Sequence, residues 1–384
     1  MKVYLDHAAT TPPFPAVIEA MTDYLQTSFG NPSSLHSFGR EAKEHLTKAR
    51  AAVGALINAP AEEIFFTSGG TESDNLAILG SAAVSKNKKH LITSSAEHHA
   101  ALDACLHLQK VGYELTVLDV DEYGMVKPEA LKKALREDTF LVSIMQANNE
   151  IGTINPIKEL TELAHQAGAL VHIDAVQSVG KIEVDVIDLG VDMLTYSAHK
   201  INGPKGVGAL YKRRGLSLQR LAYGGGQEKK VRSGTENMLG IVGFGAAAAA
   251  TQQNWRKDAQ ESQKLRDHFI QQIQANIPET HLNGHPTIRL PHNVNISFNY
   301  IEGEALLERL DLHGIACSAG SACSSGSFSP SHVLSAMALD DRWLNSAVRF
   351  SLGYGVTAEQ ISYTLDVLQK QVQQLRDLSP FYQM

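Results

Sequence analysis

The sequence contains few cysteines, and its first residues do not resemble a secretory signal; both observations bear on the expected location of the protein. Only three of its 384 residues are cysteine, which is an odd number and too small for a disulfide framework. Disulfide-poor chains are typical of reducing compartments, so we expect a cytoplasmic location. The first residues, MKVYLDHAATTPP, lack the charged leader and apolar stretch of a signal peptide, and no signal peptide is expected.

The sequence also lacks a basic excess and a long apolar run, which limits its partners. Its formal net charge of −7 argues against direct nucleic-acid binding, because phosphates require a basic surface to neutralise them. No apolar run approaches the roughly 18 residues that a membrane helix needs. We therefore expect neither a nucleic-acid nor a membrane partner.

Short β-rich runs alternate with amphipathic helical runs in the first two thirds of the chain. This alternation predicts an α/β fold with a mostly parallel central sheet flanked by helices. The strand candidates are near-continuous apolar runs, as expected when helices cover both faces of the sheet. They occupy residues 63–68, 90–95, 113–120, 139–146, 169–175, 192–198 and 206–212. Ligands bind such sheets at the carboxyl ends of the strands.

After about residue 237 the pattern changes to that of a smaller α+β domain. A long helical stretch is predicted to about residue 275, and a final helix from Thr357. Between them lie two strand candidates, HNVNISF and AVRFSLG, and a helix candidate, GEALLERLDLHG. At 384 residues, two domains are the default expectation. We expect a large domain over 15–258 and a small domain over 1–14 plus 259–384, with a mobile cysteine loop at about 318–330.

Polar clusters follow several of the predicted strands. In TSGGTESDN the glycines and Thr71 would let backbone N–H groups at a helix N-terminus approach a phosphate; the alternative is an ordinary turn capped by Thr71. HIDAVQSVGK places Asp174 at a strand end, where it could equally cap the next helix. The clusters QANNEIGTINP and SAEHHA carry amides, a carboxylate and two histidines, any of which could be structural.

Together with Lys200, these polar clusters are consistent with a single cofactor site. It lies in SAHKINGPKGVG, a segment of small and apolar residues, whereas the alternative is a solvated turn lysine. A lysine, an acid and a phosphate site at one sheet edge are what pyridoxal phosphate requires. The lysine attaches the cofactor, which needs its uncharged amine, and the acid keeps the ring nitrogen protonated.

Eight motifs together resemble the cysteine desulfurases of the NifS/IscS family, which are fold-type I pyridoxal phosphate enzymes of the class V aminotransferase group. They occur in family order from Asp6 to about Gly353, which is nearly the whole chain. They are LDHAATTP, GNPSSLHSFG, SGGTESDN, NNEIGT, HIDAVQSVGK, SAHKINGPKGVG, GGGQEKKVRSGTEN and SAGSACSSG.

The resemblance implies a role for each residue of the cofactor site. Lys200 would hold pyridoxal phosphate covalently, Asp174 would pair with its ring nitrogen, and Gln177 would reach its phenolic oxygen. His98 would stack on the ring and move protons. The phosphate would be bound by Gly70, Thr71, Ser197 and His199, and by Thr235 of a neighbouring subunit.

The substrate would be bound by two further residues. Asn149 and Arg349 carry this role in the resemblance, and a guanidinium can grip a carboxylate through two parallel hydrogen bonds. On sequence alone Arg349 could equally be a surface residue of its strand. The cross-subunit role of Thr235 implies a homodimer.

The three cysteines differ in their surroundings. Cys105 has apolar neighbours at helical spacing and is expected in the core, and Cys317 is expected to be half buried. Cys323 lies in GSACSSGSFS, a run that cannot build a core and should be mobile; it could be a loop cysteine without a task. By the resemblance it is the nucleophile, and its serine-rich continuation is similar to the longer-loop desulfurases. The cysteine spacing argues against an intrinsic metal site, although Cys323 could transiently ligate iron–sulfur.

The resemblance implies conversion of L-cysteine to L-alanine with a persulfide formed on Cys323. That sulfur would pass to an acceptor protein, such as an iron–sulfur scaffold or a tRNA thiolase, for iron–sulfur cluster assembly or tRNA thiolation. Three alternatives stay open: a selenocysteine lyase, another class V enzyme such as an aminotransferase, and a non-catalytic scaffold. The intact set of Lys200, Asp174, His98 and Cys323 argues against the scaffold.

Overall fold

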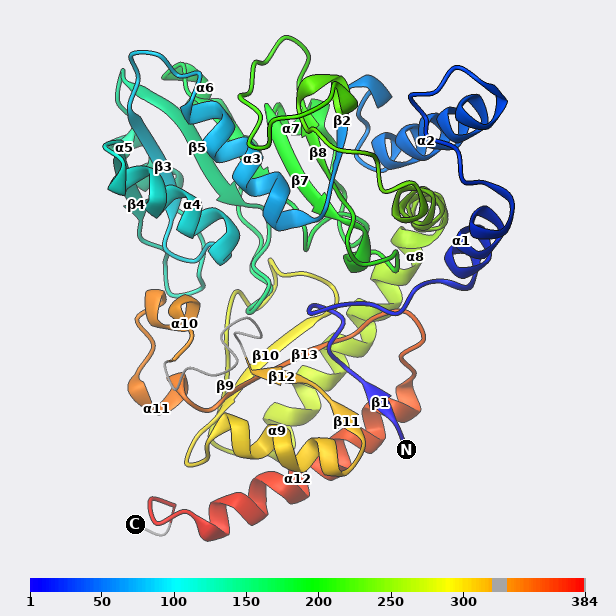
Figure 1. The fold of residues 1–384 in the computed structure, drawn as a ribbon. Coiled ribbons are helices and arrows are strands. Elements are labelled where there is room, and N and C mark those ends of the chain that lie inside the picture. The colour runs from blue at the N-terminus through cyan, green and yellow to red at the C-terminus, as the bar shows by residue number, and fades with distance from the viewer. Residues whose placement is uncertain (320–329, 383–384) are drawn as a thin grey trace.

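The alternating pattern of the first two thirds folds into a seven-stranded sheet. The computed structural model describes residues 1–319 and 330–382 (Figure 1). The strands run in the order β2-β8-β7-β6-β5-β3-β4. They are β2 (Ile64–Thr67), β3 (His90–Ser94), β4 (Glu114–Leu118), β5 (Thr139–Met145), β6 (Leu170–Asp174), β7 (Met193–Ser197) and β8 (Gly208–Lys212).

Most of these strands are parallel, which confirms the predicted fold class. The exception is β8, which pairs antiparallel with both β2 and β7. The prediction that every strand is covered on both faces is wrong for β4, whose residues are largely exposed or half buried. This strand lies at the edge of the sheet next to β3 alone, so it has fewer neighbours to cover it.

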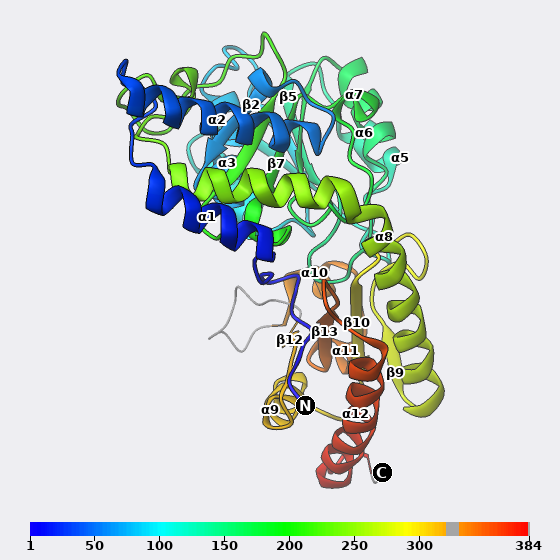
Figure 2. The same cartoon turned by 90° about the vertical axis from the view of Figure 1, so that its right-hand side faces the viewer.

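Helices cover the two faces of the sheet in separate layers (Figures 1 and 2). Alternate residues of one strand face opposite layers: Ala209 and Tyr211 pack with one cluster and Leu210 with the other. One layer contains α1 (Pro15–Thr27), α2 (Ser37–Ala55), α5 (Pro128–Ala134), α6 (Ile157–Gln166), α7 (Val186–Leu189) and the first part of α8 (Met238–Asn276). The other contains α3 (Gly70–Ala82) and α4 (His99–Lys110). Cys105 is buried in this second layer, as predicted.

A second, smaller lobe is built on a four-stranded antiparallel sheet of order β12-β13-β10-β9. Two further strands pair in parallel beside it. The lobe contains β1 (Val3–Tyr4), β9 (Thr280–Leu282), β10 (Asn293–Phe298), α9 (Gly303–Leu312), β11 (Ile315–Ala316), β12 (Ser318–Ala319), α10 (His332–Ala336), α11 (Asp341–Leu344), β13 (Ala347–Ser351) and α12 (Ala358–Leu378). The last helix begins where the sequence predicted it, because Thr357 and Gln360 form a capping box.

Helix α8 connects the two lobes (Figure 2). Its 39 residues begin at an Asn237 cap whose side chain accepts a hydrogen bond from the backbone of Gly240. Phe244 near its start belongs to the core of the large lobe, whereas Phe269 near its end belongs to the core of the small lobe. The N-terminal residues Val3 and Leu5 also pack in the small-lobe core. A domain boundary near residues 258–259 remains a proposal.

Within residues 1–319 and 330–382, none of the helices is both long enough and apolar enough to cross a membrane.

Candidate active site

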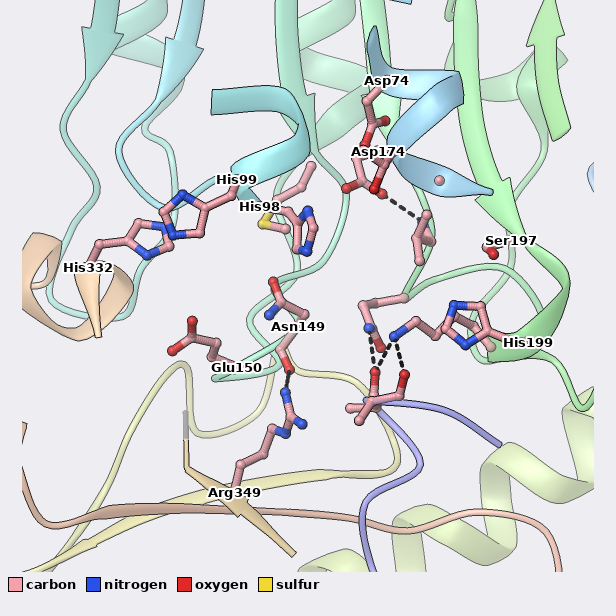
Figure 3. Close-up of a pocket in the computed structure, with 18 residues that line it drawn as sticks. Asp74, His98, His99, Asn149, Glu150, Asp174, Ser197, His199, His332 and Arg349 are labelled. Carbon is pink, nitrogen blue, oxygen red and sulfur yellow. Dashed lines mark hydrogen bonds between the residues drawn. The ribbon is translucent and has the colours of Figure 1, made fainter. Parts of the chain in front are cut away.

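A cavity of about 390 Å³ opens between the carboxyl ends of the central strands and the small lobe (Figure 3). Each central strand delivers a polar residue to it: Asp174 ends β6, Ser197 ends β7, and Asn149 follows β5. Parallel strands present their carboxyl ends at one edge of the sheet, which explains why these distant motifs meet. Ten of the predicted site residues line the cavity: Gly70, Thr71, His98, Asn149, Asp174, Gln177, Ser197, His199, Lys200 and Arg349.

Lys200 faces this cavity and contacts the N-terminal segment of the chain. It is the last residue of a short 3-10 helix, η2 (Ala198–Lys200), directly after β7. Its Nζ donates to the carbonyl oxygens of Ala8 at 2.5 Å and Ala9 at 2.8 Å. The backbone N–H of Thr11 donates to His199 O at 3.0 Å and so fastens the same segment beside η2. The alternative of a solvated turn lysine is therefore wrong.

Asp174 presents a buried carboxylate to the cavity. The side chain accepts a hydrogen bond from Val176 N at 2.9 Å. Burial raises its pKa, while His98, this hydrogen bond and Lys200 act in the opposite direction. A second carboxyl, Asp74, lines the cavity beside it, and burial together with the charge of Asp174 raises the pKa of Asp74 well above its usual value. Buried carboxylates of this kind favour a cationic partner.

The first turn of α3 forms another part of the wall. The helix starts at Gly70, and its N-cap Gly69 provides no side-chain cap, so the predicted alternative of a turn capped by Thr71 is wrong. Backbone N–H groups in a first turn lack partners within their own helix, which makes this end suited to an anion. A Cβ at position 70 would lie 3.0 Å from Val176 Cγ2, so a larger residue would crowd this approach.

Two histidines add polar ring atoms that carry no charge near neutral pH. Burial, assisted by the charges of Lys200 and Lys205, lowers the pKa of His199 to about 4. Its Nδ1 lies 3.2 Å from Thr10 Oγ1. His98 caps α4, accepting a hydrogen bond from Ala100 N at 3.1 Å through Nδ1, and burial lowers its pKa as well.

Arg349 lies on β13 of the small lobe and points into the cavity (Figure 3). It is only 2% exposed, so the alternative of a surface strand residue is wrong. Nη2 donates to Asp6 Oδ1 at 2.8 Å and Nη1 donates to Asn149 O at 3.0 Å. Nε finds no hydrogen-bond partner among the described residues. The guanidinium thus has one buried donor that the described residues do not satisfy.

For three of the predicted residues, the structure does not show the predicted role directly. Thr235 is exposed and does not line it, so its role toward a neighbouring subunit stays a prediction. Gln177 lines the cavity, but its Nε2 donates to Ala8 O at 3.0 Å. Cys323 lies outside the described residues, whereas Cys317 is half buried as predicted and burial raises its pKa. Over the described ranges, no cluster of three or more His, Cys, Asp or Glu side chains could hold a metal ion.

Sequence reasoning missed several cavity residues. Asp74 lies four residues after Gly70, a spacing that places both on one helix face. Glu150 directly follows the predicted Asn149. Each of these two residues therefore lies close in sequence to a residue that was predicted, and this proximity was a local signal that could have found it. No local signal could identify the carbonyls of Ala8 and Ala9 or the ring of His332, which reach the cavity only through the fold.

Comparisons with known proteins agree over nearly the whole chain. The aminotransferase class-V family model matches residues 3–364. The cysteine desulfurase IscS of Dictyoglomus turgidum is 51% identical over 383 residues, covering 100% of this chain and 97% of that protein. A solved NifS-like protein superposes with a TM-score of 0.92 at 39% identity, covering 98% of this chain and 100% of its own.

A further solved structure carries a ligand in its description, "SspA in complex with cysteine". It is 34% identical with a TM-score of 0.80, covering 92% of this chain and 99% of its own. The motifs of the sequence, the shared fold and these full-length matches agree: the chain belongs to the cysteine desulfurases of the aminotransferase class-V family.

Proposed function

We propose that the protein is a pyridoxal phosphate-dependent L-cysteine desulfurase that releases L-alanine and places the sulfur on Cys323 as a persulfide. The observation that carries the proposal is one cavity lined by the Lys200 amine, the buried Asp174 carboxyl and the Arg349 guanidinium. A lysine and an acid serve the cofactor, and a guanidinium serves the carboxylate of an amino acid.

The residues of the cavity fit this cofactor. Lys200 Nζ would hold its aldehyde carbon, and Asp174 would pair with the ring nitrogen as the cation that a buried carboxylate favours. The first turn of α3 at Gly70 and Thr71, with Ser197 and His199, would bind the phosphate. His98 would stack on the ring, and Gln177 would exchange its contact with Ala8 for the phenolic oxygen. When bound, pyridoxal phosphate supplies an electron sink for the bonds that break at the substrate carbons.

The protein's own residues would then orient the substrate and move its protons. Arg349 would bind the carboxylate through Nε and Nη2, directing the substrate amine toward Lys200, and Asn149 holds the guanidinium in place. The Lys200 amine, which lines the cavity, would take the proton from Cα.

Cys323 would accept the sulfur as its thiolate and pass it to an acceptor thiol. We infer a cytoplasmic homodimer to which Thr235 contributes across the interface, and acceptors such as an iron–sulfur scaffold or a tRNA thiolase. A transient iron–sulfur contact of Cys323 belongs to the same proposal. The names of the relatives favour L-cysteine over selenocysteine or a transamination substrate.

Mass spectrometry of the intact protein after treatment with L-cysteine tests the reaction and the nucleophile together. The expected result is a mass gain of one sulfur atom, located on the peptide that contains Cys323. Purified protein should be yellow, and Lys200→Ala should be colourless because the cofactor loses its attachment. A yellow Lys200→Ala protein, or sulfur located on Cys317, would contradict the assignment.

A further inference from the structure

One side of the cavity contains two histidines and a carboxyl that the proposed function leaves unused. His99 at the start of α4 and His332 at the start of α10 face each other, with ring centroids 4.6 Å apart and ring planes 46° apart. Both rings and Glu150 line the cavity (Figure 3). Imidazole is the side chain most often used for general acid–base catalysis.

The hydrogen bonds assign the proton-exchanging atom of His332. Its Nε2 lies 2.8 Å from the carbonyl oxygen of Glu97. Because a carbonyl oxygen only accepts, Nε2 carries the hydrogen, and Nδ1 is the nitrogen that gains or loses a proton. His332 thus has a fixed tautomer, and its backbone position is fixed by Ser331, which caps α10.

Two carboxyl groups lie near this pair of histidines. Glu150 is 2% exposed and accepts a hydrogen bond from Ser331 Oγ at 2.5 Å; burial raises its pKa, and His332 and Arg349 oppose that rise. On the other side, Asp103 Oδ1 lies 3.5 Å from His99 Nδ1.

The direction of the substrate side chain follows from the proposed function, on which this inference rests. If the substrate carboxylate binds Arg349 and its amine points to Lys200, the side chain on the same carbon must point elsewhere. His99 and His332 lie on a side of the cavity that the proposed function assigns neither to the cofactor nor to the substrate carboxylate and amine.

We propose that His332, paired with His99, is the acid–base catalyst of carbon–sulfur cleavage. In the overall reaction, L-cysteine and a protein thiol R–SH give L-alanine and the persulfide R–S–SH. The S–S bond forms, the Cβ–S bond breaks, and its electron pair stays with Cβ. The attacking thiol loses one proton and Cβ gains one. Nδ1 of neutral His332 takes the first proton and supplies the second, so the step needs no other acid or base.

The test separates cleavage at Cβ from proton removal at Cα. In His332→Gln the amide can still donate to the Glu97 carbonyl, but it cannot take up a proton. We expect alanine formation from L-cysteine to fall by about 10²-fold, the lower end for general acid–base catalysis. Exchange of the Cα proton of L-alanine in D₂O, followed by NMR, should stay at the wild-type rate because it uses Lys200. His107→Gln, an exposed histidine on α4, is the matched control and should change neither rate.

The outcomes distinguish the two proposals. Wild-type protein that neither exchanges the Cα proton nor forms alanine would overturn the proposed function itself. Active wild type with a normal rate of alanine formation in His332→Gln would overturn only the role of His332, as would an equal loss of both rates. If His332→Gln does not retain the cofactor absorbance, His99→Gln carries the same test, because His99 is half exposed. It should slow alanine formation and leave Cα exchange unchanged.

Discussion

Replacing Arg349 by lysine tests how the site recognises an amino acid. The guanidinium is 2% exposed and is held by Asp6 and Asn149, while its Nε has no partner among the described residues. In the proposed function, a substrate carboxylate would bind this guanidinium in a bidentate arrangement. Lysine keeps the positive charge, but its ammonium group lacks the two parallel N–H donors with which a guanidinium binds both carboxylate oxygens.

The size of the effect follows from the bond that is lost. Arg349→Lys leaves one charge-assisted hydrogen bond to the carboxylate in place of two, and such a bond contributes about 1.5–3 kcal/mol. Because 1.4 kcal/mol corresponds to a factor of ten, kcat/KM for L-cysteine should fall about 10- to 150-fold. The loss should appear mainly in KM if the carboxylate contact is equally strong in substrate and transition state.

Alanine formation at varied L-cysteine concentration measures this effect. The melting temperature and cofactor absorbance of the variant show whether the buried substitution has damaged the fold. Arg256→Lys is the matched control, because Arg256 pairs with Glu183 at the surface and should leave kcat/KM unchanged. A folded Arg349→Lys protein with kcat/KM within about threefold of wild type would refute a bidentate carboxylate contact.

Three further predictions concern the thiol, the buried carboxyl and the subunit interface. Cys323→Ser should keep the yellow colour and form no persulfide, as seen by mass spectrometry; a persulfide in that variant would place the nucleophile elsewhere. Burial raises the pKa of Glu97 from 4.5 to about 8, so the folded protein binds a proton that the unfolded chain releases in this interval. Stability in urea should therefore fall as pH rises from 4.5 to about 8, and Glu97→Gln should flatten that fall; an unchanged slope would argue against a protonated Glu97. Thr235→Ala should weaken cofactor affinity by about 10-fold or more through loss of a hydrogen bond to phosphate across a dimer, measured by equilibrium titration, and sedimentation showing an active monomer would contradict the interface.

The sequence determined the parts of this protein that depend on local pattern. Apolar runs of six to eight residues predicted the strands, because helices covering both faces of a sheet require such runs; the observed strands are four to seven residues long. Thr357 with Gln360 marked the start of α12, since a capping box acts within one turn. Asp174 and Lys200 could be selected because one ends a strand and the other closely follows a strand, and parallel strands present their ends at one edge of the sheet.

Only the tertiary structure decided which distant groups complete the site. Lys200 bonds to the carbonyl of Ala8, 192 residues earlier in the chain, and Arg349 reaches Asp6 across 343 residues. His332 meets His99 because α10 of the small lobe packs against the large lobe. These contacts depend on how two separate hydrophobic cores lie against each other, and local periodicity carries no information on that arrangement. The sequence therefore specified the chemistry of each motif, and the packing of the lobes specified which side chains share one cavity.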